Sequence, residues 1–129
     1  MVLSEADGLL RIAIADLETA IASSDSAVFR EGAWGFWLQQ SVEKALKAWL
    51  VHLGAMPPPT HDLNRLLRLL EQQAVDTGRF RSLAQLTLFA VQVRYDVNPQ
   101  PLGLDRPAFQ DQVCLLIEHI EAIVRQNPT

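Results

Sequence analysis

Residues 39–48 have the sequence Gln-Gln-Ser-Val-Glu-Lys-Ala-Leu-Lys-Ala and lie in the middle of a long helical pattern. Apolar side chains recur around this stretch at intervals of three and four residues, which is the spacing of one helix face. The pattern predicts a helix from about Ala27 to Leu53. Gly54 can adopt the left-handed conformation that closes a helix, and the prolines at 57–59 prevent its continuation. The apolar residues of this pattern are Phe29, Trp37, Val42, Leu46, Trp49, Leu50 and Leu53.

Helical patterns also lie on both sides of this central segment. Ser4 is a good N-cap for a first helix, because acidic residues follow it in the turn where the helix dipole favours them. Thr60 is the predicted N-cap of a third helix, which ends at Thr77-Gly78. The apolar stripe of the first helix is Leu10, Ile14, Leu17 and Ile21, and that of the third is Leu63, Leu66, Leu67, Leu69 and Leu70.

Two more helices complete the chain. The fourth is predicted from about Phe80 to Val93, and Asp105 can cap the last, which tolerates Pro107 in its first turn. Long helices joined by short loops favour antiparallel neighbours. The sequence therefore predicts an all-α fold, an up-and-down bundle of about five helices that forms one domain over residues 1–129.

Composition limits the function classes. The chain carries 11 basic and 15 acidic residues, for a formal net charge of -4. Nucleic-acid-binding modules usually show a strong basic excess, so any phosphate contact here requires a local cluster. Cys114 is the only cysteine, which excludes an internal disulfide and fits a reducing compartment. No apolar run reaches the roughly 20 residues of a membrane helix, so we expect a cytoplasmic protein that does not enter a membrane.

Several motifs occur in an order that resembles the HEPN family (higher eukaryotes and prokaryotes nucleotide-binding domain). The first is the 39–48 segment, which is followed by a proline-containing loop. The second is Thr60-His61-Asp62-Leu63, and the third is the pair Arg94-Tyr95 after the fourth helix. The resemblance implies a compact helical bundle that often dimerises. It also implies nucleotide binding or partnership with a minimal nucleotidyltransferase, in some cases as a toxin and antitoxin pair.

The sequence departs from this family at its ribonuclease motif, an arginine followed after four to six residues by a histidine. The histidines here are His52, His61 and His119, and none follows an arginine at that spacing. His119 comes thirteen residues after Arg106. This departure weakens the ribonuclease interpretation. The sequence therefore favours a protein without enzymatic activity and leaves the question open.

Gln40, Lys44 and Lys47 form the first part of a candidate nucleotide site. They share one helix face, since their spacing is i, i+4, i+7. Two ammonium groups and an amide on one stripe could hold a phosphate and a base edge. The alternative is a solvent-exposed face that balances its own charges, because Glu43 precedes Lys47 by four residues.

His61, Asp62, Arg94 and Tyr95 are the remaining candidates. Asp62 complements the helix dipole, whereas His61 has no local structural reason and could contact a base or pack against the bundle. Arg94 could bind a phosphate and Tyr95 could stack on a base. The alternative is that Arg94 is an ordinary cation at the end of a helix.

Three tryptophans, Trp34, Trp37 and Trp49, lie on the central helix, which is more than a narrow core stripe needs. We expect at least two in the core, and any other on a dimer surface. Gly32 and Gly35 flank Trp34 and permit close approach of another helix.

Other reactive side chains suggest no chemistry of their own. We expect Cys114 to be buried and His119 to face solvent. The histidines lack metal-ligand spacing, so we expect no metal and no cofactor apart from a possible nucleotide ligand.

The sequence thus predicts a nucleotide-binding or partner-binding module, a homodimer associated with a nucleotidyltransferase. Two alternatives stay open. One is a metal-independent ribonuclease toxin that acts on RNA through a variant site, in which His61 is the general base and Arg94 stabilises the phosphorane. The other is a purely structural interaction domain.

Overall fold

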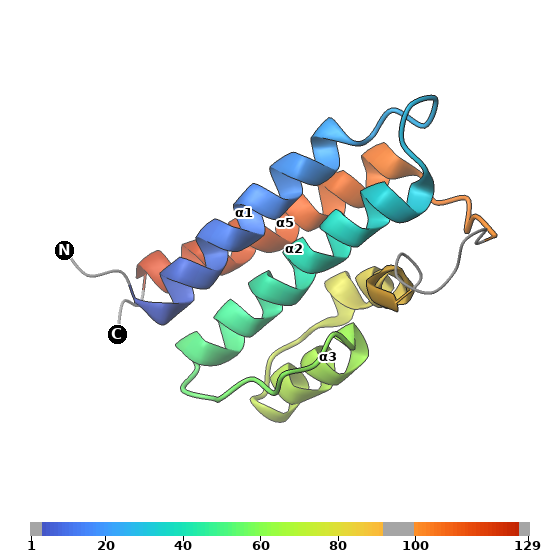
Figure 1. Ribbon diagram of the computed structural model, residues 1–129. Helices are drawn as coiled ribbons and strands as arrows, with labels where there is room; N and C mark the ends of the chain where they lie inside the picture. The colour runs from blue at the N-terminus through green and yellow to red at the C-terminus, as the bar shows by residue number, and fades with distance from the viewer. Residues whose placement is uncertain (1–3, 92–99, 127–129) are drawn as a thin grey trace.

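The computed structural model describes residues 4–91 and 100–126. Three long helices lie side by side: α1 (Glu5–Ala22), α2 (Glu31–His52) and α5 (Arg106–Gln126). The shorter α3 (Leu63–Gln72) and the 3₁₀ helix η1 (Gly78–Leu88) pack on the opposite side of α2 (Figure 1). The described residues form no strand, and the prediction of an all-α bundle is confirmed. Because α2 contacts each of the other four elements, it forms the centre of the bundle.

The α1–α2 interface is a close packing of small side chains. The residues that α1 buries include Ala6, Ala13 and Ala20, and the Ser41 hydroxyl on α2 donates a 2.7 Å hydrogen bond to the backbone carbonyl of Ala13. The predicted apolar stripe of the first helix is partly wrong, because Ile21 is exposed. Alanine can lie at a helix contact where isoleucine would hold the two backbones apart.

The central helix begins four residues later than predicted. The Asp25 side chain accepts a hydrogen bond from the backbone N–H of Ala27, and its carbonyl accepts one from Phe29. Aspartate competes with helix formation in this way, and the resulting turn ends at Arg30, which is extended. The other end agrees with prediction, because Gly54 adopts a φ of +85° directly after the last turn.

The third helix is shorter than predicted at both ends. Its N-cap is Asp62, whose carboxylate accepts a hydrogen bond from the backbone N–H of Asn64 at 3.0 Å. Thr60 instead accepts a hydrogen bond from the backbone N–H of Asp62, and so forms a local turn before the helix. The helix ends at Gln72 rather than at Thr77. Ala74, with a φ of +64°, turns the chain there.

The fourth predicted helix is mainly a 3₁₀ helix. Phe80, Leu83, Leu86 and Phe89 are buried, and they are spaced by three residues. Side chains at i and i+3 are eclipsed in a 3₁₀ helix, so this spacing places all four on one line facing the core. Residues 89–91 continue as α-helix.

The central tryptophans and a glycine fix the core around α2. Trp34 and Trp49 are buried, as predicted for at least two of the three, and Trp37 is not. The Phe89 ring lies against Gly35, where an added Cβ would be 2.4 Å from the ring. This contact is the close approach that the glycine permits.

One prediction about α5 was wrong and another was only partly right. Cys114 is exposed rather than buried. His119 is partly exposed, and its ring also packs against two aromatic rings, with ring centroids 5.2 Å from Trp49 and 5.7 Å from Phe80. The described part of the chain contains no helix that is both long enough and apolar enough to span a membrane.

Candidate functional site

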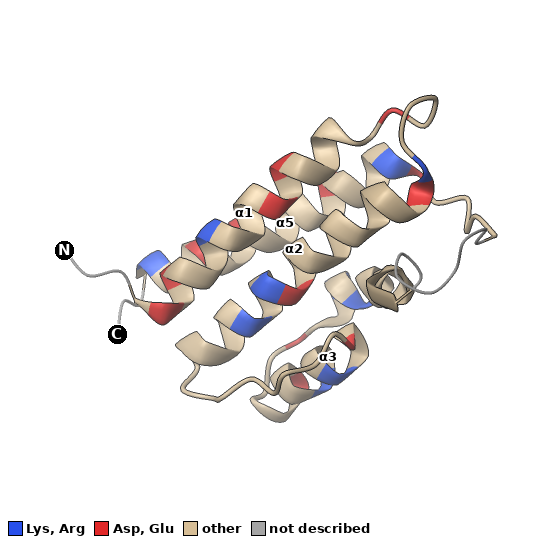
Figure 2. Cartoon of the chain, viewed as in Figure 1, with Lys and Arg blue, Asp and Glu red and all other residues tan. Residues whose placement is uncertain are grey.

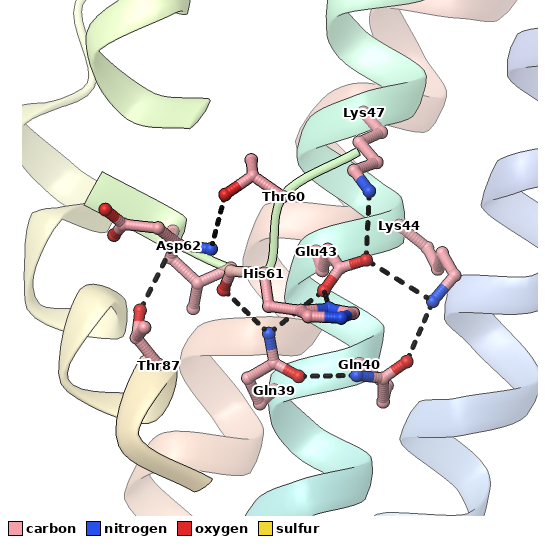
Figure 3. A network of polar contacts seen from close by, with 10 residues as sticks. Gln39, Gln40, Glu43, Lys44, Lys47, Thr60, His61, Asp62 and Thr87 are labelled. Atoms are coloured by element: carbon pink, nitrogen blue, oxygen red, sulfur yellow. Dashed lines mark hydrogen bonds and ion pairs between the residues drawn. The ribbon is translucent and has the colours of Figure 1, made fainter. Parts of the chain in front are cut away.

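Glu43, in the middle of α2, is the centre of a polar cluster on the part of that helix that runs beside α3 (Figures 2 and 3). Its side chain is only 3% exposed. The carboxylate accepts hydrogen bonds from Lys47 Nζ at 3.0 Å, from His61 Nδ1 at 2.7 Å and from Gln39 Nε2 at 3.2 Å. A buried carboxylate is stable only when such donors satisfy it.

The donors determine the charge of Glu43. Burial by itself would raise the pKa of this carboxyl, because it disfavours the ionised form. The hydrogen bonds from His61 and Lys47 outweigh burial, with a smaller contribution from Gln39, so that the pKa lies below its ordinary value. Glu43 is therefore a carboxylate at neutral pH.

A second carboxyl, Asp16 on α1, lies near the cluster. Burial raises its pKa, the Lys44 ammonium opposes this increase, and the Glu43 charge adds to it. The two lysines of the cluster are thus partly balanced by two carboxylates.

Gln40, Lys44 and Lys47 share one face of α2, as predicted. Lys44 Nζ donates a 2.9 Å hydrogen bond to Gln40 Oε1 and lies 3.7 Å from Glu43 Oε2. The side chains of both lysines are mostly covered, with 23% and 16% exposed for Lys44 and Lys47. The alternative of a solvent-exposed face that balances its own charges is right about the pair between Glu43 and Lys47, although the two lysines are only partly exposed.

His61 comes from the loop that precedes α3 and joins the cluster from outside α2. Gln39 Nε2 donates to the backbone carbonyl of His61 at 3.1 Å, which fixes this part of the loop. The pairing of Nδ1 with the ionised Glu43 places a proton on that nitrogen. Nε2 is on the opposite edge of a ring whose side chain is 59% exposed.

Of the remaining candidates, Asp62 does not join this group. The described contacts of Asp62 are those of a helix cap. Arg94 and Tyr95 lie outside the described residues. The structure thus brings together four of the seven predicted residues: Gln40, Lys44, Lys47 and His61.

Sequence reasoning missed the two residues that organise the cluster, Gln39 and Glu43. Its spacing from Lys47 predicts only a surface ion pair for Glu43. The available signal was its position one residue after the core residue Val42 and three before Leu46, which places it towards the buried side of α2. No signal in the sequence indicated that the 60–62 loop would fold back over it.

The cluster lies apart from two cavities in the described part of the chain. Among the described residues, one cavity of about 220 Å³ lies between α1 and α5, and one of about 450 Å³ lies beside the start of α2. Neither is lined by Lys44, Lys47 or His61. No three His, Cys, Asp or Glu side chains in the described ranges converge in a way that could hold a metal ion.

The chemistry available at this surface is donation of hydrogen bonds to an anion. Each ammonium group has three N–H donors, and the cluster's own contacts engage only part of that capacity. The donors are held in place by a buried acceptor, so that little side-chain entropy is lost when they bind a ligand.

One family model matches nearly the whole chain: the model of the HEPN domain family matches residues 6–126. No curated protein and no solved structure matches the chain.

Proposed function

Because the chain belongs to the HEPN domain family, we propose that it is a nucleotide-binding module whose phosphate-binding groups are Lys44, Lys47 and His61. The observation that carries this proposal is the cluster around Glu43, in which one buried carboxylate orients two ammonium groups and an imidazole. Such preorganised donors favour anion binding because their geometry is set before the ligand arrives.

The carboxylate at the centre does not prevent this function. Glu43 is almost fully covered, whereas the side chain of His61 is 59% exposed and those of Lys44 and Lys47 remain partly exposed. Charge-assisted hydrogen bonds from these groups to phosphate oxygens are the strong kind. Since the global charge is -4, this local cluster has to supply the attraction.

Calorimetric titration with ATP and GTP, each with and without magnesium, tests the proposal. The Lys44→Ala/Lys47→Ala variant should bind at least tenfold more weakly, since each charged hydrogen bond contributes about 1.5–3 kcal/mol. An Arg65→Ala/Arg68→Ala variant is the matched control, because it removes two exposed cations from α3 and leaves the cluster intact. Equal binding by the double lysine variant and the wild type would disprove the site.

A second candidate function, a ribonuclease, is favoured by the 2.7 Å contact between Glu43 and His61. With Nδ1 held by a carboxylate, Nε2 could take the proton of a 2′-hydroxyl while that oxygen attacks phosphorus and the 5′-oxygen leaves. Incubation with total RNA tests it beside His61→Ala. Absence of cleavage by the wild type, or cleavage that survives the substitution, would reject it.

We also infer that the module associates with itself and with a nucleotidyltransferase. The support is the family and the exposed apolar side chains on the outer surfaces of the long helices: Ile12, Ile21 and Leu115. Light scattering of the wild type and of Ile12→Glu tests self-association. Co-purification with a nucleotidyltransferase tests the partner. A monomer that retains no nucleotidyltransferase would reject both associations and leave the nucleotide as the remaining ligand.

A further inference from the structure

Trp37 differs from the other two tryptophans of α2 in that it lies at the surface. It is 38% exposed, whereas Trp34 is 0% and Trp49 is 2% exposed. A large aromatic ring left partly in water forgoes the stabilisation that its burial would give. The Trp37 ring is nevertheless held in place, because the Phe36 ring packs edge-to-face on it at a centroid distance of 5.3 Å.

The position of Trp37 on α2 connects it with the polar cluster. Residues 37, 40, 44 and 47 follow the spacing i, i+3, i+7, i+10, which places them on one face of the helix. Trp37 lies one turn before Gln40 and, at 1.5 Å per residue, about 10 Å along the axis from Lys44. One strip of α2 therefore presents an aromatic ring, then an amide, then two ammonium groups.

The amide between them is already engaged at both ends. Gln40 Nε2 donates to Gln39 Oε1 at 2.7 Å, and Gln40 Oε1 accepts from Lys44 at 2.9 Å. Gln40 is thus better suited to position Lys44 than to recognise the edge of a base. Any base next to this strip would contact a ring face and few hydrogen-bonding groups.

We propose that Trp37 is the base-stacking platform of the α2 surface, so that the strip binds a nucleoside polyphosphate as a whole rather than phosphate alone. This inference rests on the proposed nucleotide-binding function. The order of ring, amide and ammonium groups matches the order of base, sugar and phosphates in the ligand. Because every base has a π-face, stacking on Trp37 discriminates little between adenine and guanine.

The test compares three ligands, ATP, GTP and inorganic triphosphate, by calorimetry with four proteins. These are the wild type, Trp37→Ala, Trp37→Phe and Phe29→Ala. Phe29 is the matched control, because it is 39% exposed and precedes α2, outside the strip formed by residues 37–47. Trp37→Ala should weaken ATP and GTP binding about tenfold, as expected for the loss of one stacked base. It should leave inorganic triphosphate unchanged, and Trp37→Phe should recover most of the loss.

The outcomes separate this inference from the function on which it rests. If nucleotides bind with equal affinity to the wild type and to Trp37→Ala, the platform is wrong and the phosphate site survives. If Trp37→Ala weakens inorganic triphosphate equally, its effect is on the fold and the platform is again wrong. If the wild type binds neither nucleotide, both inferences fail. Quenching of tryptophan fluorescence by ATP in the wild type, lost in Trp37→Phe, would support stacking directly.

Discussion

His61 Nδ1 lies 2.7 Å from Glu43 Oε1, although the two residues are 18 positions apart and come from different elements. This contact joins the middle of the central helix to the loop before α3. A buried negative charge is matched by a donor from a loop that is itself tied down by Gln39. The pair therefore links local folding of the loop to the arrangement of the two lysines.

Replacement of Glu43 by glutamine should destabilise the protein by about 2 kcal/mol, because the substitution removes the charge that Lys47 and His61 share. Urea unfolding measures the change, and Glu18→Gln on the exposed face of α1 is the control. The effect should also depend on pH. The depressed pKa of Glu43 makes the wild type more stable above the ordinary value of 4.5, and this advantage is lost as pH falls below it. Equal stability of the two proteins at pH 7 would contradict this account.

Gly35→Ala should destabilise the protein by about 1–3 kcal/mol, since the new methyl group would collide with the Phe89 ring in a packed core. Gly8→Ala on α1 is the matched control. No atom lies within 4 Å of its added Cβ, so the higher helix propensity of alanine should stabilise by up to about 1 kcal/mol. Thermal unfolding of both variants measures the difference, and effects of the same sign would refute the steric explanation.

Ala74→Gly should stabilise the protein by about 1 kcal/mol. Alanine at a φ of +64° occupies the left-handed region, which costs a side-chain-bearing residue roughly 1–2 kcal/mol. Glycine relieves this cost, although it adds entropy to the unfolded chain. Chemical denaturation is the measurement, with Ala22→Gly, at the last position of α1, as the control that should destabilise. A destabilised Ala74→Gly variant would show that the turn carries no strain.

Protonation of His119 should weaken the packing of α5 on α2 and η1. Burial lowers the pKa of this imidazole below 6.5, and the nearby Arg79 lowers it further. The unfolded chain therefore binds more protons just below pH 6.5, so stability falls as pH is lowered through that value. His119→Phe keeps the aromatic contacts and should reduce this loss, as measured by thermal unfolding between pH 7.5 and about 5. An unchanged pH profile would mean that His119 does not carry the effect, and His52→Gln is the control for general loss of a histidine.

Much of the fold could be predicted because local chemistry specified it. Ser4 caps α1 through the backbone N–H of Asp7, Asp105 caps α5 through that of Ala108, and Gly54 closes α2. Each of these residues acts on groups within three positions of itself. The boundary errors have the same origin, because Asp25 and Ala74 form local turns that a periodic apolar pattern does not reveal.

The candidate site could be predicted only in part. The helical spacing of Gln40, Lys44 and Lys47 is a local property, and it placed them on one face correctly. Whether that face was exposed depended on the loop at 60–62, which crosses α2 and covers Glu43. Contacts of this kind follow from the packing of separate elements, so no periodicity within one helix contains them.

By itself, the sequence determined the helices, most of their caps and the all-α class, since propensity, capping and spacing act within a few residues. Tertiary structure decided that Glu43 is a buried acceptor, that His61 reaches it, that Trp37 stays at the surface, and that η1 winds as a 3₁₀ helix. The physical reason is that burial is a property of the assembled bundle. A carboxylate becomes the centre of a site only when other elements exclude water from it and supply its hydrogen-bond donors.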